Sequence, residues 1–116
     1  MLILPIKKKW FDMIASGEKK EEYREIKPYY KTRFYNAINE VLEKETFAQQ
    51  ATNLILYNNE VWIDVLFRNG YRKNSPTIKC KCNFAGKRTG KKEWGAEEGK
   101  QYYVLKILEV EKVGDE

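Results

Sequence analysis

Hydrophobic and polar positions follow regular periods along most of the chain, and the period changes from segment to segment. Residues 2–6 form a short apolar run that predicts a first strand. Apolar residues at helical spacing then predict a short helix from residue 8 or 9 to residue 16, and Gly17 is a typical helix stop. Residues 19–25 alternate between two faces, which predicts a second strand.

A longer helix is predicted over residues 28–44. Pro28 suits the first position of a helix, where its missing N–H has no intrahelical partner. An apolar stripe at helical spacing follows, formed by Phe34, Ile38, Val41 and Leu42.

The second half of the chain is rich in strand patterns. We expect strands at residues 53–57, 61–68, 78–84 and 102–113. Asn58-Asn59 and Asn69-Gly70 are plausible turns, residues 47–52 a connection, 86–99 a long polar loop, and 114–116 a frayed end. The order predicts one α+β domain over all 116 residues: a small mixed, mostly antiparallel β-barrel flanked by two or three helices.

Positive charge is concentrated in one part of the sequence. The chain carries a net charge of +5, yet residues 68–92 contain nine basic residues and no acidic one, so the remainder is negative. The nine are Arg68, Arg72, Lys73, Lys79, Lys81, Lys87, Arg88, Lys91 and Lys92. Such segregation indicates either a polyanionic partner or a solvated face that keeps the protein soluble.

Histidine is absent, and Cys80 and Cys82 are the two cysteines. The absence of histidine excludes His-based triads and the commonest metal ligand. Two cysteines make a poor zinc site, and a bridge between residues two apart on a strand is strained, so we expect both thiols to face a core. No metal or cofactor is expected. With no membrane-length apolar run and no signal-peptide pattern, the sequence favours a reducing cytoplasm and no membrane partner.

Three lysines precede the first helix. Lys7, Lys8 and Lys9 oppose the helix dipole unless a bound anion reverses the sign of that interaction, or unless they point into water and are screened. Trp10 beside them is either a core residue or a stacking platform.

Gly17, Lys19, Glu22 and Arg24 stand at the spacing Gly-x-Lys-x-x-(Glu or Thr)-x-Arg. With the preceding Leu-Pro-Ile-Lys-Lys-Lys-Trp-Phe-Asp-Met-Ile segment and the later Glu-Trp-Gly, this pattern resembles the ASCH domain family of the PUA-like superfamily, in its small bacterial or phage-type members. The resemblance covers nearly the whole chain. It implies a PUA-like β-barrel with a cleft between barrel and helices, and RNA or a modified nucleoside or nucleotide as the partner.

The second strand supplies the central candidate residues. Glu22 and Arg24 share one strand face and are expected to pair, with Lys19 turning into the same cleft. Arginine binds phosphate through two parallel hydrogen bonds, and a carboxylate accepts from an exocyclic amine of a base. The alternative is a solvated, salt-bridged strand without a ligand.

Further candidate binding residues surround this set: Lys7, Lys9, Tyr71, Lys87, Arg88 and Trp94. Cations, glycines and an aromatic residue within the expected 86–99 loop suit single-stranded nucleic acid, although they also suit a plain solvated loop. Tyr71 is either part of the cleft rim or an ordinary turn residue.

Three functions remain open from the sequence. The first is RNA or nucleotide binding. The second is hydrolysis of a modified nucleoside or RNA, with Lys19 and Glu22 as catalytic residues. Some ASCH proteins resemble amidohydrolases of N4-acetylcytidine that use a Lys, a Thr nucleophile and a Glu, but Glu22 occupies the Thr position here, and a carboxylate is not an equivalent nucleophile. A ribonuclease without histidine would depend on Lys19 or Glu22 as base. The third is a protein-interaction domain that uses exposed aromatic residues.

Overall fold

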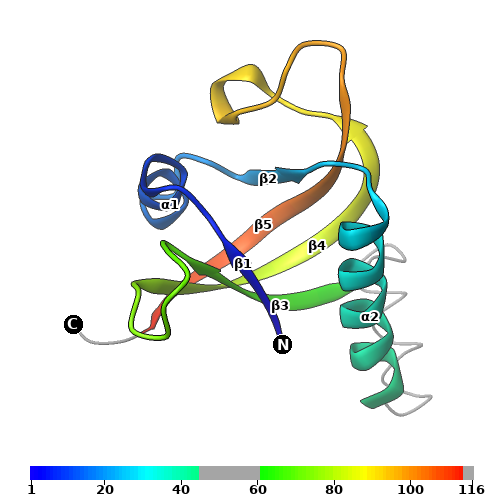
Figure 1. Ribbon diagram of the computed structural model, residues 1–116, viewed down its shortest axis with the longest axis horizontal. Coiled ribbons are helices and arrows are strands. Elements are labelled where there is room, and N and C mark those ends of the chain that lie inside the picture. Colours follow the sequence, from blue (N-terminus) through cyan, green and yellow to red (C-terminus); the bar gives the residue numbers. More distant parts are fainter. Residues whose placement is uncertain (45–60, 114–116) are drawn as a thin grey trace.

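A mixed five-stranded sheet curls around the core, and two helices pack against it in the computed structural model, which describes residues 1–44 and 61–113 (Figure 1). The elements are β1 (Leu2–Pro5), α1 (Lys8–Ala15), β2 (Glu21–Arg24), α2 (Pro28–Lys44), β3 (Trp62–Arg68), β4 (Thr77–Thr89), the short 3-10 helix η1 (Lys92–Trp94) and β5 (Gln101–Val113). The α+β class and most of the expected elements are therefore confirmed.

The strand order in the sheet is β1-β3-β4-β5-β2. β1 runs parallel to β3, while the β3–β4, β4–β5 and β5–β2 pairs are antiparallel. Among the described residues no strand joins the outer edge of β1 to that of β2, so the sheet is a curled half-barrel. The expected barrel is thus present in a coarser form, with an open seam between its first two strands.

Strand alternation builds the core as the sequence predicts. On β3, Ile63, Val65 and Phe67 are buried, and on β4 the thiols of Cys80 and Cys82 face the same interior. Burial raises the pKa of the Cys80 thiol to about 12 and also raises that of Cys82. Both cysteines are free, and at neutral pH they remain protonated and unreactive.

Two helices of different length, α1 and α2, cover the core. α1 contributes the fully buried Ile14, and the amphipathic α2 contributes Phe34, whose ring contacts Phe84 and Tyr103. Gly17 has a φ of 85°, a left-handed conformation that favours glycine and ends the first helical segment as expected.

The expected loop at residues 86–99 is wrong over its first part. β4 continues to Thr89, and Lys87 and Arg88 pair in register with Tyr103 and Tyr102 of β5. A register irregularity between Phe84 and Gly86 bends the strand, and Gly86 adopts a φ of 80° there. A bulge of this kind accounts for the error, because it turns a glycine into part of a bent strand rather than its end.

Several sequence expectations lie outside the described residues: the connection at 47–52, the strand at 53–57, the Asn58-Asn59 turn and the frayed end at 114–116. Among the helices that the structure describes, none has the length and apolar character needed to cross a membrane.

Candidate functional site

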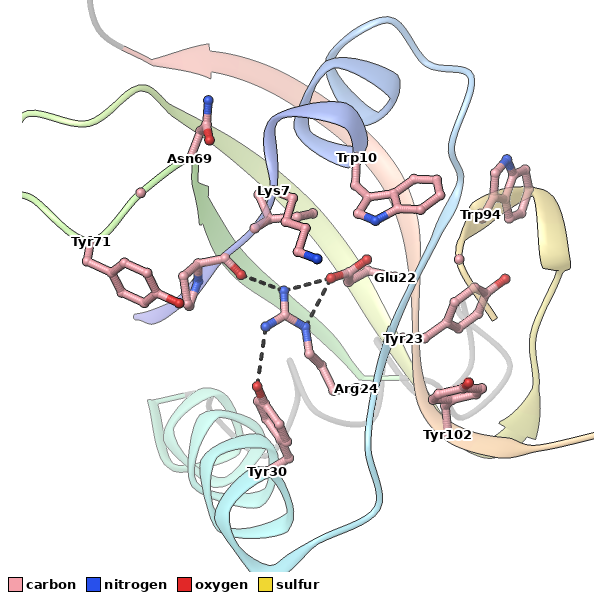
Figure 2. A pocket seen from close by; sticks show the side chains of 14 residues that line it. Lys7, Trp10, Glu22, Tyr23, Arg24, Tyr30, Asn69, Tyr71, Trp94 and Tyr102 are labelled. Atoms are coloured by element: carbon pink, nitrogen blue, oxygen red, sulfur yellow. Dashed lines mark hydrogen bonds and ion pairs between the residues drawn. The ribbon is translucent and has the colours of Figure 1, made fainter. Parts of the chain in front are cut away.

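A pocket of about 520 Å³ opens at the seam between β1 and β2 (Figure 2). We call it the seam pocket. Its lining comes from the end of β1, α1 and the residues between them, β2, the start of α2, the turn after β3, the segment around η1 and the start of β5. The lining residues are Pro5, Ile6, Lys7, Trp10, Glu22, Tyr23, Arg24, Tyr30, Asn69, Gly70, Tyr71, Trp94, Gly95 and Tyr102. Its volume is typical of a small-molecule or nucleotide site.

A carboxylate–guanidinium pair forms the floor of the seam pocket. Nε and Nη2 of Arg24 both donate to Oε2 of Glu22, at 3.0 and 2.6 Å. The two side chains are nearly buried, at 11% and 8% exposed. The predicted pairing on one strand face is therefore confirmed, and it is a buried ion pair rather than a solvated one.

Arg24 also bridges the open seam. Its Nη2 donates to the carbonyl oxygen of Pro5 on β1 at 2.8 Å, and its Nη1 donates to the Tyr30 hydroxyl on α2 at 3.4 Å. One side chain thus joins β2, β1 and α2. Burial alone would lower the pKa of Arg24, but the charge of Glu22 and the hydrogen bonds of Glu22 and Tyr30 outweigh burial and raise it, so the guanidinium remains charged.

Lys19 lies behind this pair. Its side chain is 1% exposed, and its ammonium group approaches Glu22 Oε1 at 3.2 Å and donates to the backbone carbonyl of Trp94. The rings of Trp10 and Tyr23 lie 4.9 and 5.0 Å away. Burial lowers the pKa of Lys19, while the Glu22 charge opposes that shift. Lys19 joins the expected cluster, yet it does not line the seam pocket.

The segment around η1 forms one wall and is held by close packing. Gly95 lies against the Trp10 ring, where a β-carbon would come within 3.2 Å of the indole. The Tyr23 hydroxyl accepts from the Lys91 backbone N–H and donates to Glu21, both at 2.8 Å. Together with the Lys19 bond to Trp94, these contacts fix Trp94 at the pocket wall.

Six aromatic residues line the seam pocket, and five of them have a cation over the ring: Trp10, Tyr23, Tyr30, Trp94 and Tyr102. Tyr71 differs, because among the described residues no cation or second ring contacts it, and it is 88% exposed. Its ring is therefore available to stack on a ligand.

The structure gathers five of the predicted site residues in the seam pocket: Lys7, Glu22, Arg24, Tyr71 and Trp94. It does not bring in four others. Lys9 lies over the Trp10 ring at 4.6 Å, Lys19 is buried behind Glu22, and Lys87 and Arg88 belong to β4.

Sequence reasoning missed Tyr23, Tyr30, Asn69 and Tyr102 as lining residues. Tyr23 lies within the motif from Gly17 to Arg24, where strand alternation predicts that it faces away from Glu22. Its ring nonetheless reaches the pocket. Tyr30 and Tyr102 reach the pocket through tertiary packing, for which no local pattern gives a signal.

The charge of this cluster is positive. Among the charged residues that line the pocket, Lys7 and Arg24 are positive and Glu22 is negative, and the ammonium group of Lys19 lies behind Glu22. Three donors already engage the Glu22 carboxylate, so few of its lone pairs remain open to a ligand. In the part of the chain that the structure describes, His, Cys, Asp and Glu form no group of three that would hold a metal ion.

No family model, curated protein or solved structure matches this chain.

Proposed function

We propose that this domain binds RNA or a nucleotide in the seam pocket, as a PUA-like domain of the ASCH type. The observation that carries the proposal is a cationic, aromatic-lined pocket whose buried arginine retains donor capacity. Phosphate supplies the negative charge that the pocket lacks, and a nucleobase supplies a flat surface for Tyr71. The spacing of Gly17, Lys19, Glu22 and Arg24 supports the family, because three of these residues form one connected cluster.

The hydrolase alternative has less support. Lys19 is separated from the seam pocket by Glu22 and by two aromatic rings, so it does not reach a ligand there. Glu22 is engaged by Lys19 and Arg24 on both carboxylate oxygens. These contacts favour binding over nucleophilic or general-base catalysis.

The first test is a tryptophan-fluorescence titration with a short single-stranded RNA at low and physiological salt. Trp10 and Trp94 line the seam pocket, so a ligand there should quench them. Tyr71→Ala should weaken binding about tenfold, since base–aromatic stacking contributes about 1–3 kcal/mol per base.

Tyr35→Ala is the matched control. Tyr35 is also an exposed tyrosine, at 43%, and it lies on α2 outside the pocket lining. Its ring contacts Phe84, which does not line the pocket. Because both side chains are exposed, neither substitution should unfold the protein. A flat titration with the native protein, or equal weakening by both substitutions, would show that the pocket is not the RNA site.

A further inference from the structure

Two positively charged groups at the seam pocket have unused hydrogen-bond donors. Arg24 has five N–H groups, and four of them account for its bonds to Glu22, Pro5 and Tyr30. One N–H of Nη1 is therefore uncommitted, and the other makes only the long 3.4 Å contact with Tyr30. The Lys7 ammonium group forms no hydrogen bond or ion pair with any described residue.

Both groups line the seam pocket. Figure 2 shows the Lys7 side chain pointing toward Arg24 and Glu22, while Nη1 of Arg24 lies on the side of the guanidinium away from Glu22. Two cations that face each other repel unless an anion lies between them. Glu22 does not serve as that anion for Lys7, since its oxygens are engaged by Lys19 and Arg24 and it makes no ion pair with Lys7.

We infer that the seam pocket has a phosphate subsite, in which a phosphate accepts hydrogen bonds from Lys7 Nζ and Arg24 Nη1. The inference rests on the proposed function and makes it more specific, because it places the phosphate inside the pocket. Tyr71 lines the same pocket and presents a free ring, so it receives the base attached to that phosphate. The ligand unit is thus one nucleotide with its phosphate, either free or within a chain.

Arg24 is preorganised for this role. The carboxylate of Glu22 and the carbonyl of Pro5 fix its guanidinium, so little side-chain entropy is lost when an anion binds. Lys19 balances the charge of Glu22 from behind, which leaves the positive charge of Arg24 available to the pocket. Lys7 is exposed and adjusts to the ligand.

The experiment compares adenosine, adenosine monophosphate and a short oligoadenylate by isothermal titration calorimetry. With the native protein, adenosine monophosphate should bind at least about tenfold more tightly than adenosine, a ratio that one charge-assisted hydrogen bond provides. Lys7→Met should remove most of that ratio, because it weakens the binding of adenosine monophosphate far more than that of adenosine. Lys20→Met removes the same charge from an exposed lysine outside the pocket and should preserve the ratio.

The outcomes with the three ligands distinguish a failure of this inference from a failure of the function on which it rests. If adenosine and adenosine monophosphate bind equally, or if only the oligoadenylate binds, the phosphate subsite is wrong while nucleic-acid binding stands. If none of the three ligands binds, the proposed function itself fails. If Lys7→Met and Lys20→Met reduce the affinity ratio of adenosine monophosphate to adenosine equally, the ratio reflects the net charge of the protein, and the subsite is also wrong.

Discussion

At the scale of single residues, Lys19 shows how a buried charge is accommodated. The ammonium group has lost nearly all contact with water, which disfavours its charged form. Glu22, the Trp94 carbonyl and the faces of Trp10 and Tyr23 replace that water. Lys19 is therefore a positioning residue that orients Glu22 and fixes the wall bearing Trp94.

Lys19→Met should lower the free energy of unfolding by about 1–3 kcal/mol, because the Trp94 carbonyl and one oxygen of Glu22 lose their donor. Urea denaturation followed by circular dichroism measures this change. Lys20→Met, at the exposed neighbouring lysine, should have almost no effect. Equal stabilities of the Lys19 and Lys20 variants would contradict the positioning role.

The same residue gives a pH dependence whose sign is defined. Burial lowers the pKa of Lys19 below its ordinary value of 10.5, so the unfolded chain retains the proton to higher pH than the folded chain does. Between these two pKa values, the contribution of Lys19 to stability rises with pH. The stability difference between the native protein and Lys19→Met should accordingly grow as pH increases toward 10.5, and a shrinking difference would argue against this reasoning.

What the sequence reveals at this scale depends on separation along the chain. Glu22 and Arg24 are two apart on a strand, so alternation alone predicts that they share a face and pair. The partner of Lys19 at Trp94 lies 75 residues away, and no local periodicity indicates it. Likewise, only the packing of the whole chain shows that the Tyr71 ring has no cation over it among the described residues, whereas the other aromatic rings of the pocket do.

At the scale of elements, the seam between β1 and β2 is held by side chains instead of a strand ladder. Arg24 donates to the Pro5 carbonyl, and Arg33 on α2 donates to the Ile3 carbonyl at 2.7 Å. Two β1 carbonyls are thus satisfied without a neighbouring strand on that side. The sequence predicted both strands but not this arrangement, because strand patterns define a core face and do not specify which edges pair.

The junction of β4 and η1 depends on the missing side chain of Gly90. A β-carbon at that position would lie 2.6 Å from the Tyr23 ring and 2.8 Å from the Ala96 β-carbon. The Tyr23 ring has little freedom to move away, because its hydroxyl is bonded to Lys91 and Glu21 and its face contacts Lys19.

Gly90→Ala should therefore destabilise the protein by about 1–3 kcal/mol through overpacking. It should also shift the Trp94 emission, because the wall of the seam pocket moves with this junction. Thr89→Ala, at the exposed adjoining position, serves as the control and should change stability by less than about 0.5 kcal/mol. Thermal unfolding of the two variants compares them directly, and a Gly90→Ala protein as stable as the control would refute the packing argument.

At the scale of the whole molecule, the nine basic residues of the segment 68–92, here called the basic block, do not all lie on one surface. Lys79 and Lys81 pair in register with Glu111 and Glu109 on β5, and Asp64 lies opposite Lys81 on β3. Acidic residues on the neighbouring strands therefore oppose the positive charge of Lys79 and Lys81. Lys91 and Lys92 instead adjoin Trp94 at the seam pocket, with Lys91 over its ring. Residue counting therefore predicted the total charge of the block correctly but could not show which lysines stand beside the pocket.

This division predicts that two charge-matched double variants differ in RNA binding. Lys91→Gln with Lys92→Gln should weaken binding to a short single-stranded RNA and reduce the slope of log affinity against log salt by up to about 1.4, because each lost phosphate contact accounts for about 0.7. Lys79→Gln with Lys81→Gln removes the same two charges from a surface where acidic neighbours oppose them, so affinity and slope should stay near those of the native protein. Fluorescence titrations at several salt concentrations give both slopes. Equal reductions would mean that the RNA responds to net charge alone, whereas the expected difference would place its path beside Trp94.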